Sequence, residues 1–222
     1  MKTRFILFAL ACLASLQVVA QEEELVNRYL FPEYTRGSVH NLDGSVINSV
    51  LLNYDTVSDE MLFVDEVSNE ILSIANPASI AYINIDGRQF VFGKKQSFYE
   101  RIAMDDNYFF IQWHSRVQSK GKAAAYGGYS QTTSVDNISS FQSGTGTQHN
   151  LKIDEKFTSI PTNTYFLSIN NKLKQFVSQK ALLKLMKGHE NEVNTFIKDE
   201  KINFRKGEDV TKLVAYCYEL LK

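Results

Sequence analysis

The sequence predicts an α+β protein in which a mainly antiparallel β domain is followed by a C-terminal cap of three helices. Two patterns along the chain lead to this prediction. Residues 34–116 contain short runs of alternating apolar and polar residues separated by turn-forming residues, which is typical of antiparallel strands. Beyond Ser178, apolar residues recur instead at three- and four-residue spacing, which is typical of amphipathic helices.

The first half of the chain is expected to form a meander, folded as a roll, a sandwich or a partly closed barrel. Strands are predicted at 46–54, 61–64, 71–75, 80–85, 89–92, 98–102 and 108–114. Turn-forming pairs such as Ser58-Asp59, Ser68-Asn69 and Asp86-Gly87 separate them. The last of these predicts the clearest hairpin, because a type I′ turn requires positive φ at both central positions.

Residues 118–150 interrupt this pattern. Nineteen of these 33 residues are Gly, Ser, Thr or Gln, so the segment buries little apolar surface to offset its ordering entropy. A mobile loop and short strands are both compatible with that composition. We favour short strands near 126–135 and 138–141, joined by long connections. One further hairpin is predicted from 165–169 and 172–177, on either side of Asn170-Asn171.

Three helices are predicted for the tail, at 179–187, 190–200 and 208–221. Ser178 is a plausible N-cap for the first, and Gly188 follows its end. The third helix places Val210, Leu213, Val214, Cys217 and Leu221 on one face. Ile202 and Phe204 lie in the connection before it, where we expect them to fill space between the helices. Residues 21–177 are therefore assigned to the β domain and residues 178–222 to a helical subdomain.

The N-terminus has the pattern of a secretory signal peptide. A basic start, Met1-Lys2-Thr3-Arg4, precedes an apolar run of about fifteen residues, and small residues follow before a charged segment. We predict cleavage between Ala20 and Gln21, which places the mature protein in the periplasm or outside the cell, with outer-membrane association possible. The apolar run is shorter than the roughly 20 residues that span a bilayer, so no transmembrane segment is expected in the mature chain.

Charge and cysteine content narrow the classes of partner. Loss of residues 1–20 would remove two basic residues and leave 22 basic and 25 acidic ones, without a basic run. Nucleic acid is therefore not an expected partner. Cys217 is the one cysteine left after cleavage, so no intrachain disulfide is expected. Its position on an apolar helix face predicts a buried structural thiol.

Several segments of the chain resemble uncharacterised exported proteins of Bacteroidota-like Gram-negative bacteria. The similar segments are 44–45, 52–55, 61–63, 125–127, 178–185, Phe196-Ile197-Lys198, 201–204 and 209–216. They cover structural positions rather than chemical motifs. The resemblance thus implies export from a Gram-negative cell and carries over no activity and no functional residue.

Motifs with a catalytic mechanism are not found in the sequence. It contains no phosphate-binding loop, no nucleophile elbow and no calcium loop. The four histidines, His40, His114, His149 and His189, show no paired spacing of the kind zinc ligands have. We therefore expect neither a metal nor a cofactor, and we expect the protein not to be an enzyme.

The candidate binding residues are aromatic. Tyr126 and Tyr129 lie in the glycine-rich segment, where exposed rings on polar loops would suit a glycan or a protein surface; packing beneath the loop is the alternative. Trp113 and His114 lie side by side on a predicted strand. The sequence thus favours an exported binding or envelope-interaction protein whose partner is an envelope protein or a glycan.

Two other functions stay open. The first is a hydrolase of envelope or dietary polymers built from convergent carboxylates, for which the candidates are Asp55, Asp59, Glu60, Asp65 and Glu66. The second is a structural subunit of an envelope assembly, which would expose a large apolar patch.

Overall fold

The structure is a computed structural model. It describes residues 28–93, 96–119, 122–123, 129–130, 157–169 and 172–222. The predicted cleavage site at Ala20 and Gln21 lies outside these ranges, as does most of the segment 118–150.

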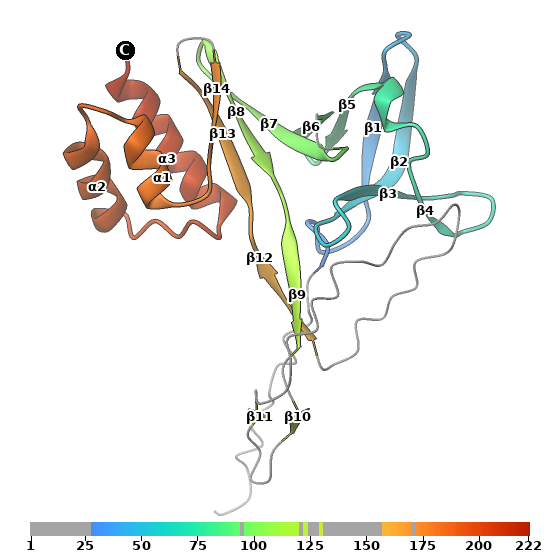
Figure 1. Cartoon of the computed structure of the whole chain (residues 1–222). Helices are drawn as coiled ribbons and strands as arrows, with labels where there is room; N and C mark the ends of the chain where they lie inside the picture. The colour runs from blue at the N-terminus through green and yellow to red at the C-terminus, as the bar shows by residue number, and fades with distance from the viewer. Residues whose placement is uncertain (1–27, 94–95, 120–121, 124–128, 131–156, 170–171) are drawn as a thin grey trace, which may run out of the picture.

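One open antiparallel sheet of ten strands forms the body, and three helices follow it at the C-terminus (Figure 1). The predicted α+β class with a C-terminal helical cap is confirmed, and the sheet is not closed into a barrel. In chain order the strands are β1 (Thr35–Asn41), β2 (Val46–Asp55), β3 (Glu60–Val64), β4 (Ile71–Ser73), β5 (Ile80–Ile85), β6 (Arg88–Phe92), β7 (Phe98–Met104), β8 (Asn107–Gln112), β13 (Thr164–Ile169) and β14 (Lys172–Phe176).

The spatial order of the strands differs from a simple meander. It runs β14-β13-β8-β7-β6-β5-β1-β2-β3-β4. The chain leaves the edge strand β4, passes through a short 3₁₀ turn, η1 (Pro77–Ser79), and returns as β5 to pair with β1. All three residues of β4 are exposed, which suits a short strand at a sheet edge. By contrast, β1 is an interior strand, paired with β2 on one side and β5 on the other, and its Val39 side chain is buried.

The predicted turns are confirmed by backbone conformation. Asp86 and Gly87 have φ values of 50° and 73°, so both central positions of the β5–β6 hairpin are left-handed, as a type I′ turn requires. Asp59, Asn69 and Asp105 also have positive φ at predicted breaks between strands. Aspartate and asparagine tolerate this region better than other residues with a side chain, which is why local sequence located these turns.

A two-stranded ribbon extends from the body. It consists of β9 (Ser115–Ser119), which follows β8, and β12 (Phe157–Pro161), which precedes β13; the two strands pair antiparallel (Figure 1). The prediction of one strand over 108–114 was wrong at its end, because β8 stops at Gln112 and the chain changes sheet at Trp113 and His114. The short strands β10 (Lys122–Ala123) and β11 (Tyr129–Ser130) pair with each other.

The helices are α1 (Gln179–Leu185), α2 (Glu190–Asp199) and α3 (Gly207–Leu220). The predicted N-cap is confirmed, because the Ser178 hydroxyl accepts a hydrogen bond of 3.4 Å from the Ala181 amide. On α3 the predicted apolar face is buried except for Leu221, which is 41% exposed. Leu221 lies beyond the last helical residue, so its side chain does not continue the apolar face.

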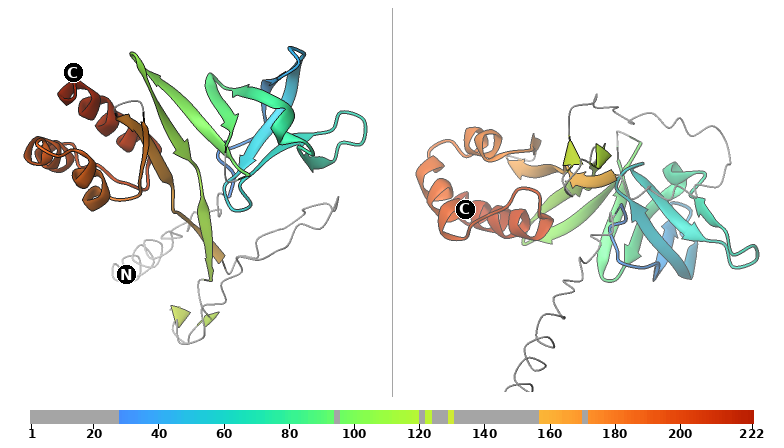
Figure 2. Two further views of the ribbon diagram at one scale, coloured as in Figure 1. Left: turned by 45° about the horizontal axis from the view of Figure 1, so that its top comes forward. Right: turned by 90° about the horizontal axis from the view of Figure 1, so that it is seen from below.

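The buried residues form two hydrophobic cores along one sheet. The first core joins β8, β13 and β14 to the helices, whereas the second lies within the half of the sheet built from β1, β2, β3, β5 and β6. In both views of Figure 2 the helices and the blue and cyan strands lie on opposite sides of the molecule. Trp113 packs against both cores, so this side chain marks the junction between them. No helix in the described part of the chain has the length and apolar character needed to cross a membrane.

Cys217 lies in the first core as a free, fully buried thiol. Burial raises its pKa to about 12, because a thiolate is poorly solvated there. We expect no reaction with a thiol-specific reagent near pH 8 in the native state and rapid reaction in urea. Fast native labelling that leaves the melting temperature unchanged would contradict this packing.

Candidate functional site

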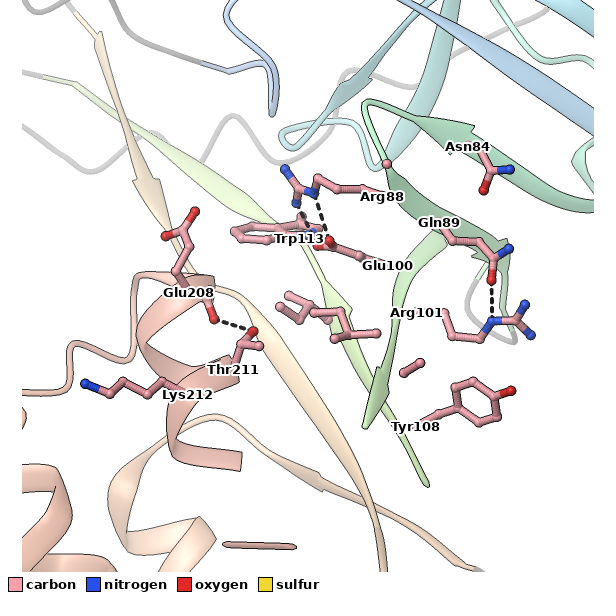
Figure 3. Close-up of a pocket in the computed structure, with 15 residues that line it drawn as sticks. Asn84, Arg88, Gln89, Glu100, Arg101, Tyr108, Trp113, Glu208, Thr211 and Lys212 are labelled. Atoms are coloured by element: carbon pink, nitrogen blue, oxygen red, sulfur yellow. Dashed lines mark hydrogen bonds and ion pairs between the residues drawn. The ribbon is translucent and has the colours of Figure 1, made fainter. Parts of the chain in front are cut away.

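The main cleft of the described structure lies at the junction of the two cores. Its volume is about 800 Å³. Residues of β6, β7 and β8 form one side, and the first two turns of α3 form the other (Figure 3). Apart from Asn84 of β5, the labelled side chains fall into three groups: Arg88, Glu100 and Trp113 near the junction; Gln89, Arg101 and Tyr108 farther along the sheet; and Glu208, Thr211 and Lys212 on the helix.

Strand register brings the first group together. Phe90 pairs with Glu100 across β6 and β7, and Glu100 pairs with Ile111 across β7 and β8. Arg88 and Trp113 are each two residues beyond these partners, so both are diagonal neighbours of Glu100 on the same face. Diagonal neighbours lie about 7–8 Å apart at the backbone, within reach of long side chains.

The Glu100 carboxylate is held by three donors. Arg88 donates from Nε to Oε1 at 2.7 Å and from a terminal nitrogen to Oε2 at 2.6 Å. The Trp113 indole N–H donates to Oε2 at 2.7 Å. The Glu100 side chain is 7% exposed and that of Arg88 is 27% exposed. The bidentate geometry is the strong form of an arginine–carboxylate pair, and it fixes both side chains.

Arg88 also lies over aromatic rings from both sides of the junction. Its guanidinium carbon is 5.1 Å from the Trp113 ring and 5.1 Å from the Phe31 ring. Such cation–π contacts stabilise the cation without neutralising it. The edge of Trp113 in turn lies against α3, because a Cβ on Gly207 would be 2.1 Å from Cη2 of the indole. The helix can therefore approach Trp113 this closely only with glycine at position 207.

The second group carries a positive charge that has no carboxylate partner among the described residues. Arg101 donates from Nε to the Gln89 amide oxygen at 2.6 Å, and its guanidinium lies 5.2 Å from the Tyr108 ring centroid. Within the described residues, no partner is found for its two terminal nitrogens. Tyr108 is 48% exposed. Lys212, on the opposite side, forms an ion pair with Glu200.

His114 is placed next to this cleft but does not line it. Its ring Nδ1 lies 2.8 Å from the Asp59 carboxylate, in the turn between β2 and β3. Its backbone amide donates to the Asn163 side chain, and its carbonyl accepts from the Thr162 amide. The hydrogen bond from Asp59 raises the pKa of His114, and partial burial opposes that rise. His114 thus links the β2–β3 turn to the start of the ribbon.

This pair predicts a pH-dependent contribution to stability. Because the folded pKa of His114 is above its unfolded value of about 6.5, the folded state binds the proton more tightly. The stabilisation is present below pH 6.5 and is lost as pH rises through the folded pKa. We expect His114→Gln to lower the free energy of unfolding by about 1 kcal/mol or less at pH 5.5, since the pair is partly exposed, and by less at pH 8.5. Urea unfolding at both values measures the difference.

A matched control is His40→Gln, because the His40 ring contacts the Ser38 hydroxyl rather than a carboxylate. An equal loss for both variants at both pH values would contradict the role of the Asp59 pair.

The structure brings only part of the predicted site together. Trp113 lines the cleft and His114 lies beside it. Tyr126 is outside the described residues. Tyr129 belongs to β11, and its side chain is not among those the structure describes.

The candidate carboxylates of a hydrolase are distributed among turns and ion pairs. Asp55 pairs with Arg28 and accepts amide hydrogen bonds from Val57 and Ser58. Asp59 holds His114, and Asp65 accepts hydrogen bonds from the next turn. None of these carboxylates lines the cleft. Across the described part of the chain, no group of three or more His, Cys, Asp or Glu side chains is placed to hold a metal ion.

Sequence reasoning missed Arg88, Glu100 and Gly207. A signal for the first two was present, because each lies at two-residue spacing from apolar residues of its strand and so shares their face. Arg88 has this spacing with Phe90 and Phe92, and Glu100 has it with Phe98 and Ile102. Oppositely charged residues at inward positions of neighbouring strands indicate a buried ion pair. Gly207 had no such signal, since its close contact is with a residue 94 positions earlier.

The chain matches no protein-family model, and comparison with the curated proteins and with solved structures likewise finds no match.

Proposed function

We infer that the protein is an exported, non-catalytic binding protein whose ligand occupies the cleft between the sheet and α3. The ligand belongs to the cell envelope or its surroundings and is a glycan or an envelope protein. The observation that carries this proposal is a preformed cleft of about 800 Å³ whose polar and aromatic side chains are already fixed by one another. A volume in this range fits a ligand of small-molecule size or a segment of a polymer.

The state of the cleft carboxylates supports binding rather than hydrolysis. The buried Glu100 accepts hydrogen bonds from Arg88 and Trp113, so its lone pairs are engaged and it is poorly placed to move a proton. A two-carboxylate hydrolase needs two acids that are both free to act on the substrate. Glu208 also lines the cleft, but Glu100, the other acid of its lining, is already engaged. The Arg88, Glu100 and Trp113 side chains are instead held in place before a ligand arrives, which lowers the entropic cost of binding.

Export rests on the N-terminal sequence. The basic start and apolar run at residues 1–20 support a cleaved signal peptide. Mass spectrometry of the protein recovered from a Gram-negative host would test it, with Gln21 expected as the first residue. A chain that retains residues 1–20 and stays with the membrane fraction would contradict the placement.

The cleft is tested by filling it. Ala103 lines the cleft and is exposed, so Ala103→Trp should occupy the cavity with little effect on stability. Ala75→Trp is the matched control, because Ala75 is also exposed and lies outside the cleft. Residues 21–222 would be presented to a glycan array and to envelope extract.

We expect a retained ligand that Ala103→Trp loses and Ala75→Trp keeps. Retention that is the same for both variants, or no retention above that of an unrelated protein, would contradict binding in this cleft.

A further inference from the structure

The cleft opens onto a sheet face that the helices do not cover. The helices pack against the face that carries Phe109, Ile111, Tyr165 and Leu167. Because side chains alternate along a strand, Phe110 and Phe166 point to the opposite face. There they form two ring pairs with tyrosines of the same face. The ring centroids are 5.4 Å apart for Tyr99 and Phe166 and 6.3 Å apart for Tyr108 and Phe110.

Strand register orders part of this face into one straight line. Each member is the direct cross-strand partner of the next, and together they form what we call the cross-strand row: Gln89, Arg101, Phe110, Phe166 and Gln175. It crosses β6, β7, β8, β13 and β14 at right angles to the strands. Four inter-strand spacings of about 4.8 Å give it a length of roughly 19 Å. Its first two members line the cleft.

The chemistry of the row is specific. Two aromatic rings occupy its middle, a side-chain amide lies at each end, and Arg101 is the one charged residue that β6, β7, β8, β13 and β14 place on this face. Gln89 and Tyr108 hold the Arg101 guanidinium in place, while within the described residues its two terminal nitrogens have no partner. A planar guanidinium with two free N–H groups side by side matches a carboxylate.

We propose that the row binds an extended glycan that carries carboxylate groups, with one carboxylate on Arg101 and sugar rings stacked on Phe110 and Phe166. This inference rests on the proposed function and names the class of the cleft's ligand, which extends from the cleft onto the uncovered face of the sheet. The hydroxyls of the flanking sugars are hydrogen-bonded by the amides of Gln89 and Gln175. The ligand lies across the strands and enters the cleft at Gln89 and Arg101.

Other extended polymers fit the row less well. A peptide would gain affinity on a sheet by adding a strand to an edge, but the backbones of β7, β8 and β13 are already paired on both sides. A single-stranded nucleic acid also stacks on aromatic rings, yet it requires a groove of several cations along its backbone. This face has one. Carboxylated sugars need only the single cation and the apolar rings.

The test measures binding to matched polysaccharides by affinity electrophoresis. Polygalacturonate, alginate and hyaluronan supply carboxylates, galactan is the neutral counterpart, and dextran sulfate and a single-stranded oligonucleotide supply other anions. We expect at least one of the three polyuronates to bind at least tenfold more tightly than galactan. Arg101→Gln should reduce that affinity to the level of galactan.

Matched variants separate the row from general charge and from packing. Arg116→Gln removes an exposed arginine of β9 outside the row and should leave binding unchanged. Phe166→Leu keeps most of the apolar volume but removes the flat ring, so it should weaken every glycan that binds. Tyr108→Leu is the second ring variant. Because Tyr108 is exposed, this variant should stay folded even if Phe166→Leu does not.

Three results would overturn the inference: no binding of any polyuronate, tighter binding of dextran sulfate or the oligonucleotide, or equal losses for Arg101→Gln and Arg116→Gln. If another ligand is retained and then lost with Ala103→Trp, the cleft still binds and only the ligand class is wrong. If Ala103→Trp changes nothing, the proposed function fails as well.

Discussion

Replacement of Asp55 by asparagine is expected to lower the free energy of unfolding by roughly 3–5 kcal/mol, the usual cost of leaving one member of a buried ion pair without its partner. The side chains of Arg28 and Asp55 are 8% and 3% exposed. Asparagine keeps the oxygen that accepts from the Val57 and Ser58 amides and removes only the charge. Urea unfolding followed by tryptophan fluorescence measures the loss.

Asp65 supplies a matched control for this variant. It makes the same turn contacts, with the Val67 and Ser68 amides, but it is only partly buried, and no arginine among the described residues pairs with it. Apart from any change in its turn hydrogen bonds, Asp65→Asn should therefore lower the free energy of unfolding by well under 1 kcal/mol. Arg28→Met combined with Asp55→Asn should restore part of the loss, because no buried charge then remains unpaired. Equal effects of Asp55→Asn and Asp65→Asn would show that the ion pair contributes nothing.

Replacement of Gly207 by alanine is the second large effect expected. The new Cβ would lie 2.1 Å from Cη2 of Trp113, and that ring is wedged between the two cores. Either the indole or α3 must move, and overpacking of this kind costs about 1–3 kcal/mol. Because the moving parts line the cleft, binding of any cleft ligand should weaken together with stability.

The sign of this effect should reverse when the ring is absent. In a Trp113→Leu background, Gly207→Ala no longer meets the indole, and it adds a residue of higher helix propensity, worth up to about 1 kcal/mol. We expect it to be neutral or stabilising there. A loss of the same size in both backgrounds would place the cause in the helix terminus rather than in the contact with Trp113.

Much of the candidate site could not be predicted because it depends on pairs that are distant in sequence. Trp113 was identified as a candidate, yet its partners Glu100 and Gly207 are specified by the register of β7 against β8 and by the docking of α3. Likewise, Arg101, Phe110 and Phe166 look unrelated along the chain. The β7–β8 hairpin brings Arg101 beside Phe110, but Phe166 joins them only when β13 pairs with β8 after an excursion of more than forty residues.

Local patterns were sufficient for the α+β class, the helical cap, the Ser178 cap and the Asp86-Gly87 turn, because periodicity, capping and left-handed φ are set by residues a few positions apart. The pairing of β5 with β1, the break at Trp113, the two cores and the cleft between them required the folded chain. Each depends on which strands meet and in what register, and that choice is made by the burial of whole faces rather than by any short segment.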